Sequence, residues 1–151
     1  MAIDRRTEMS PEATEAFLGR QETGVLALAR TDEPYAIPVS YGFDAEDRQF
    51  YMRLVSTPES EKRRFLASSP AARLVVYEEV DESYRSVIAI GTLERIDPDE
   101  LTVEDIQQYG SAKRPLFEIW PKQKGDLDIE LYRLTPETLS GRLVEVDREK
   151  N

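Results

Sequence analysis

The chain of 151 residues contains no cysteine and no histidine. Their absence excludes disulfide bonds, thiolate nucleophiles, Ser-His-Asp arrangements and the usual zinc sites. No apolar run approaches the roughly 20 residues that a membrane-spanning helix needs, and the polar amino terminus lacks an apolar signal segment. We therefore expect a cytoplasmic protein. No catalytic residue and no metal site can be named, so any chemistry is expected from carboxylates or from a cofactor.

Basic residues are scarce as well. Acidic residues outnumber them 30 to 20, which gives a net charge of -10 and an isoelectric point near 4.6. This balance repels nucleic acid unless a basic patch is segregated. The sequence has one short basic cluster rather than a stripe, so we expect no nucleic-acid partner. Acidic surfaces occur in proteins of a high-salt cytoplasm and in many ordinary soluble proteins, and the composition leaves both open.

The length predicts a single domain over residues 1–151, with a core at about 15–142 and a charged, frayed tail after Gly141. Apolar residues with a period of two predict six strands, at residues 25–29, 35–43, 49–55, 73–78, 84–96 and 128–134. Helices are predicted from Ser10-Pro11-Glu12 onward, at residues 58–67 and at residues 102–109. This order favours a mainly β (α+β) fold, a small antiparallel barrel with short flanking helices.

Two residues inside predicted strands are expected to interrupt their regularity. Pro38 lies within the second predicted strand and cannot donate a backbone hydrogen bond. It therefore marks a sheet edge, a bulge or the approach of a ligand. Gly91 interrupts the long fifth strand, where a bend or a bulge is expected.

The stretch from Arg53 to Leu66 is predicted to run from a strand directly into a helix, with Thr57 as its N-cap. Three bases, Lys62 to Arg64, crowd its first turn and a half, where the partial positive charge of the helix disfavours them. A bound phosphate, held by backbone N–H groups, the Ser60 hydroxyl and a base, would remove this conflict. The alternative is a solvated helix whose bases form ion pairs with the acids that flank Ser60.

The segment Ser60 to Tyr77 resembles the FMN-binding split-barrel family, which includes pyridoxamine 5′-phosphate oxidase and the nitroimidazole-resistance proteins. The shared pattern is Ser-x-Lys at a helix start, a Leu one turn later, a Ser-Pro stop and an apolar strand. Ala36 to Tyr41 is similar to the second strand of the family, Tyr84 to Val87 to its fifth, and Leu139 to Arg142 to its Gly-Arg ending. The resemblance covers roughly Glu15 to Arg142.

This resemblance implies a six-stranded antiparallel split β-barrel that forms a homodimer, with FMN in two grooves at the subunit interface. The cofactor-binding residues that it implies are Arg53, Ser60 and Lys62 at the phosphate, Pro38, Val39, Ser40 and Tyr41 at the ring, Ser86 on the fifth strand, and Trp120 from the partner. Several of these residue types also have an ordinary structural role, since bases and prolines protect edge strands and aromatic rings pack in cores.

The sequence departs from the family at the substrate side. Gly141-Arg142-Leu143-Val144 lacks the His of the Arg-x-His motif in pyridoxamine 5′-phosphate oxidase, and Arg53 stands about where the nitroimidazole-resistance proteins carry a His. The resemblance therefore implies an FMN-dependent oxidoreductase with a nicotinamide electron donor and an unknown small substrate. The alternatives are a non-catalytic flavin carrier or sensor, or the same barrel with a deazaflavin or a haem. For haem, only Tyr or Met remain as axial ligands.

The proposed phosphate contacts can be tested by replacing both side chains, Ser60→Ala with Lys62→Ala. Charge-assisted hydrogen bonds contribute roughly 1.5–3 kcal/mol each, so the double variant should bind FMN more weakly by a few kcal/mol. The measurement is a fluorescence titration with FMN. An unchanged dissociation constant would end the phosphate assignment.

Overall fold

The computed structural model of the chain describes residues 3–56, 61–66, 70–97, 99 and 128–147. Its strands are β1 (Ile3–Glu8), β2 (Thr23–Arg30), β3 (Glu33–Ser40), β4 (Gly42–Asp44), β5 (Gln49–Ser56), β6 (Ala71–Val80), β7 (Ser83–Ile96) and β8 (Asp128–Asp147), and its helices are α1 (Pro11–Arg20) and α2 (Glu61–Leu66). All strand pairs are antiparallel, in the order β3-β2-β6-β7-β8-β5-β4, and β1 pairs with β8. The predicted mainly β class is confirmed.

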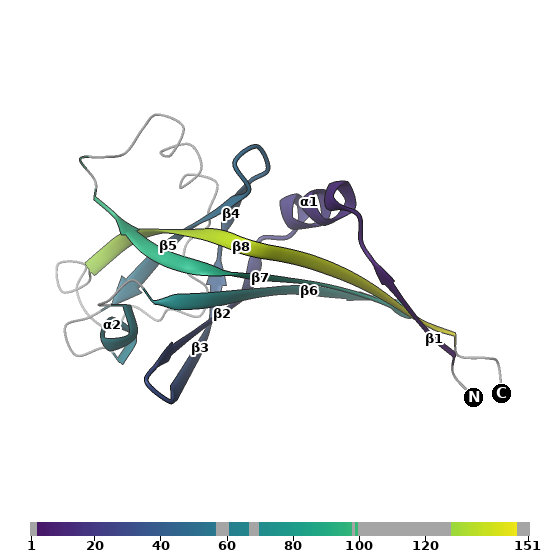
Figure 1. Ribbon diagram of the computed structural model, residues 1–151, viewed down its shortest axis with the longest axis horizontal. Coiled ribbons are helices and arrows are strands. Elements are labelled where there is room, and N and C mark those ends of the chain that lie inside the picture. The colour runs from purple at the N-terminus through teal and green to yellow at the C-terminus, as the bar shows by residue number, and fades with distance from the viewer. Residues whose placement is uncertain (1–2, 57–60, 67–69, 98, 100–127, 148–151) are drawn as a thin grey trace.

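The first helix begins where the sequence predicts. The Ser10 hydroxyl accepts a hydrogen bond from the Ala13 N–H at 3.1 Å, and Pro11 occupies the first turn, where no backbone donor is needed. Phe17 and Leu18 are fully buried. These two side chains fix α1 against the sheet at the level of β4 and β8 (Figure 1).

The core lies on the inner face of the curved sheet. Strand side chains alternate between two faces, and the inner face carries most of the buried apolar side chains. The largest fully buried side chains are Phe17, Leu18, Leu26, Phe50, Met52, Phe65, Leu74, Val76, Val87, Leu93 and Leu134. The second helix contributes Phe65, whose ring stacks on Tyr35 of β3 with centroids 4.8 Å apart. Helix α2 therefore covers the sheet near the beginning of β3.

The pairing of β7 with β8 contains the irregularity that Gly91 predicts. Ile90 pairs with Thr138 and Gly91 pairs with Pro136, so the register skips one residue of β8. A Cβ added at Gly91 would overlap the carbonyl oxygen of Thr135. Only glycine fits this close approach of the two backbones.

Three expectations about the strands are wrong in detail. The sheet has eight strands rather than six, because residues 3–8 form β1 and the predicted strand at 35–43 is divided at Tyr41 into β3 and β4. The last strand runs to Asp147, whereas a strand ending at 134 and a frayed tail after Gly141 were expected. Pairing with β1 on one side and β7 on the other stabilises this end.

Other sequence predictions fall on residues that the structure does not describe. The expected N-cap at Thr57 and the expected helix at residues 102–109 lie outside the described ranges. Within those ranges, no helix is long and apolar enough to span a membrane.

The close approach at Gly91 gives a direct test of the bulge. Gly91→Ala should lower the free energy of unfolding by about 3 kcal/mol or more, because the obstacle is backbone and cannot move aside cheaply. Gly19→Ala is the matched control, since nothing lies within 4 Å of its added Cβ. It should stabilise α1 by up to about 1 kcal/mol. Urea denaturation measures both, and equal effects would contradict the bulge.

Candidate functional site

The outer face of the sheet carries a band of small and apolar side chains. Register pairs align Pro38 of β3 with Val25, Val75 and Ile88 of the next three strands. The neighbouring row contains Ala36, Ala27, Arg73 and Ile90. In this band Pro38 and Ala36 are exposed and the valines and isoleucines are partly exposed. We call these two rows the outer apolar face.

The outer apolar face is also hollowed. A shallow cavity of about 330 Å³ lies on it, lined by Ala27, Leu28, Ala29, Ala71, Ala72, Arg73 and Ile90. One third of the residues in this chain are charged, yet Arg73 is the single charged residue in the two rows and in this lining. A continuous exposed apolar surface of this kind suits a flat apolar ligand or a second protein surface.

The open edge of β3 adds polar groups to this face. The backbone N–H of Tyr41 donates to the Glu22 carbonyl at 3.0 Å, so this N–H faces the segment that leads into β2. Backbone groups in an antiparallel pair alternate in direction, which places those of Ala36 and Pro38 on the side away from β2. The missing N–H of Pro38 therefore costs no ladder hydrogen bond. Of the edge, the bulge and the ligand approach that the sequence left open at Pro38, the structure shows the edge. The edge offers the Ala36 N–H and both carbonyls.

The family resemblance implies that Val39, Ser40 and Tyr41 lie at a cofactor ring. In the structure all three residues are buried, at 2–3% exposure. The Tyr41 hydroxyl donates to the Leu18 carbonyl at 2.8 Å, and its ring meets Phe50 edge-on at 5.5 Å. Burial raises the pKa of this phenol well above its usual value, so Tyr41 stays protonated. Its side chain joins α1 to the core. At this segment, the structure therefore points to the backbone edge rather than to these side chains as the part that a ligand reaches.

Arg53 lies on the outer side of β5, in register with Leu131 of β8. It is partly buried, and its Nε atom is inaccessible to solvent. The next outer position on β8 is Arg133, whose Nη2 atom donates to the Glu94 carboxylate at 2.9 Å. Tyr51, also on this side of β5, is 2% exposed. Arg53 thus lies on a part of β5 that pairs with β8 and extends past the β4 pairing, which ends at Tyr51.

Ser86 lies on the outer face of β7, between Tyr77 of β6 and Arg142 of β8. Three strand spacings separate β7 from β3, or about 14 Å. One chain therefore does not bring Ser86 next to Pro38. Of the other predicted contacts, Ser60 and Trp120 lie outside the described residues, as does the Lys62 side chain, although its backbone belongs to α2.

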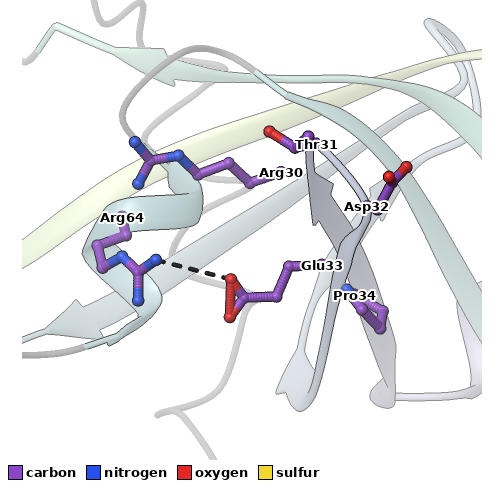
Figure 2. A pocket seen from close by; sticks show the side chains of 6 residues that line it. All are labelled: Arg30, Thr31, Asp32, Glu33, Pro34 and Arg64. Carbon is purple, nitrogen blue, oxygen red and sulfur yellow. Dashed lines mark ion pairs between the residues drawn. The ribbon is translucent and has the colours of Figure 1, made fainter.

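The structure adds a cavity that sequence analysis missed. A hollow of about 530 Å³ lies between the β2–β3 turn and α2, lined by Arg30, Thr31, Asp32, Glu33, Pro34 and Arg64 (Figure 2). The residues that line it are 30 positions apart in the sequence, and the packing of Phe65 on Tyr35 brings them together. The crowded bases after residue 61 were the one sequence signal that pointed here.

Several solved structures share the fold of this chain. A Corynebacterium glutamicum protein named for pyridoxamine 5′-phosphate oxidase is 17% identical, with 95% of this chain and 96% of that chain covered and a TM-score of 0.68. An FAD-binding protein from Mesorhizobium loti is 22% identical over 93% and 98%, with a TM-score of 0.69. A haem-binding protein from Mycobacterium smegmatis is 20% identical over 88% of this chain and 54% of its own, at 0.63. At these identities the likeness concerns the fold.

The family of this chain follows from its sequence. No curated protein matches the chain, but the family model described as pyridoxamine 5′-phosphate oxidase matches residues 10–143. This range includes both helices, the outer apolar face and the β2–β3 cavity. The chain therefore belongs to the pyridoxamine 5′-phosphate oxidase family, with the split-barrel fold of its structural neighbours.

Proposed function

We propose that the chain binds a flavin, FMN or its mononucleotide portion, on the outer apolar face beside the open edge of β3. The observation that supports this most is the combination of the outer apolar face with the backbone groups of Ala36 and Pro38, which point away from β2 where β3 ends the order of described strands. An isoalloxazine ring has apolar faces and a rim of hydrogen-bonding atoms, so it needs both. The phosphate would be held by Arg53, Ser60 and Lys62, as the family pattern implies.

A homodimer completes this site. Pro38 and Ser86 lie on the same face of one chain but too far apart to contact one ring. If two outer apolar faces meet across a two-fold axis, Ser86 of one subunit reaches the ring held at Pro38 of the other. Tyr77 is the most exposed large apolar side chain among the described residues, at 67%, and lies beside Ser86. Its exposure in a single chain is consistent with such an interface.

The activity that we propose is electron or hydride transfer between a nicotinamide donor and a small acceptor. The bound flavin supplies the redox chemistry, and the protein supplies position and electrostatics. The Ala36 N–H is placed to donate to the ring, and Arg53 contributes positive charge near the phosphate. No acid or base is assigned. A carrier or sensor would use the same residues, and multiple turnovers with an electron acceptor distinguish the two.

A haem in place of flavin is a weaker candidate, although one structural neighbour binds haem. The chain has no His or Cys to ligate iron. The hydroxyl of Tyr41 is engaged with Leu18, and Met52 is fully buried in the core. A deazaflavin differs from a flavin at the ring, and the same open edge would serve it.

The proposal predicts that the protein is purified with bound flavin. Its absorption spectrum should show the flavin maxima, and mass spectrometry of the released ligand should identify the nucleotide. If the purified protein is colourless and added FMN leaves its melting temperature unchanged, flavin binding is refuted.

The dimer is tested at Tyr77. The unaltered chain should sediment at about twice its mass of 17.3 kDa. Tyr77→Glu places a charge in the proposed interface without disturbing the core, so it should sediment as a monomer and lose flavin. Ala45→Glu, in the exposed β4–β5 turn, is the control that should do neither. A flavin-bound monomer of the unaltered chain would contradict the interface.

A further inference from the structure

The cavity between the β2–β3 turn and α2 is lined by two arginines and two acids, Arg30, Arg64, Asp32 and Glu33. In Figure 2 the guanidinium groups of Arg30 and Arg64 lie on the same side of the pocket, and Glu33 reaches toward Arg64. The Asp32 carboxylate points away from both. Two cations therefore face one anion. Within the part of the chain that the structure describes, Arg30 forms no ion pair.

The one ion pair in this pocket is easily exchanged. Arg64 Nη2 lies 3.6 Å from the Glu33 carboxylate, and the two side chains are 55% and 49% exposed. Exposed pairs of this length contribute little, because solvent screens them. A phosphate offers a guanidinium two oxygens in a matching geometry and binds it more strongly than a screened carboxylate does. An incoming phosphate can thus engage Arg30 and Arg64 together.

The turn residue Thr31 is unusual. Its φ of 56° lies in the left-handed region, which is unfavourable for a β-branched residue and favours glycine. The threonine nevertheless lines the pocket, and in Figure 2 its hydroxyl points to the side on which Arg30 lies. A hydroxyl there can donate to a phosphate oxygen.

The pocket and the proposed flavin site share strand β3. Pro34 lines it, and side-chain alternation places Pro34 on the same face of β3 as Ala36 and Pro38. From Pro38 to Pro34 the strand spans about 13 Å. Arg64 lies three residues after the start of α2, or about 4.5 Å along its axis. A ligand with its ring at Pro38 and a phosphate near α2 therefore ends at this pocket.

We propose that the Arg30–Arg64 pocket binds the adenylate half of a flavin dinucleotide, so that the protein prefers FAD to FMN. The two guanidinium groups and the Thr31 hydroxyl hold the second phosphate, and Pro34 offers an apolar surface to the base. This inference rests on the proposed flavin site and specifies the form of cofactor that it takes.

The test compares dissociation constants for FAD and FMN, measured by fluorescence titration on the full chain. The unaltered protein should bind FAD at least tenfold more tightly. Arg30→Gln should raise the dissociation constant for FAD about tenfold and leave that for FMN unchanged. Arg30→Lys keeps the positive charge but lacks the paired N–H donors of the guanidinium, so it should raise the FAD dissociation constant by less. Glu33→Gln should tighten FAD alone, because it releases Arg64. Arg48→Gln, an exposed arginine outside the pocket, is the control.

Two results would overturn the assignment. One is FMN binding with no preference for FAD, which refutes the pocket and leaves the flavin site standing. The other is an equal change in both constants in Arg30→Gln, which would place Arg30 at the shared mononucleotide portion. Failure of the unaltered protein to bind either flavin is a third and different result, since it removes the proposed function itself and this pocket with it.

Discussion

The pairing of β8 on both of its edges is the constraint on which the rest of the fold depends. This twenty-residue strand pairs with β5 near its beginning, with β7 along most of its length and with β1 at its end. Among the described strands, β8 is the one that pairs with both the β3-β2-β6-β7 half of the sheet and the β5-β4 half. The skipped residue opposite Gly91 lies in the middle of this strand, so the register of both halves is set there. A shift of one residue would turn every side chain to the opposite face.

Because that register is held, the two faces of the sheet have separate roles. The inner positions of β6 and β7 supply Leu74, Val76 and Val87 to the core, while the outer positions supply Val75 and Ile88 to the outer apolar face. The strands in this region are therefore apolar on both faces. The inner face forms the hydrophobic core. The other remains for a ligand and a second subunit, and its edge groups at β3 supply polarity that the side chains lack.

Sequence reasoning succeeded where a pattern is local. The cap at Ser10, the edge at Pro38 and the bulge at Gly91 each follow from one residue type and its backbone preference. It failed where pairing decides the structure. Residues 3–8 have no apolar alternation, and they form β1 because the end of β8 offers them a partner. Residues 141–147 look like a charged tail, yet neighbours on both sides make them a strand.

The same distinction holds for the candidate sites. The alternation at residues 35–43 indicated a strand, which the structure divides at Tyr41 into β3 and β4. The alternation could not tell which backbone groups of β3 face β2, and the hydrogen bond from the Tyr41 N–H to the Glu22 carbonyl does. Arg30 and Arg64 share no pattern in the sequence. A stacked pair of rings, Tyr35 and Phe65, brings their elements together. A pocket made by tertiary packing leaves little trace in spacing or composition.

The pairing of Ile3 with Asp147 has a practical consequence for how this chain can be rearranged. The first and last described strands run side by side, so the two ends emerge at the same extremity of the sheet, away from α2 (Figure 1). A short linker could join them, and the chain could be reopened in the exposed turn around Ala45. Such a circular permutant would keep every strand pair while converting β1 and β8 into one continuous hairpin. Reporter domains fused next to Ile3 and Asp147 would, for the same reason, be neighbours.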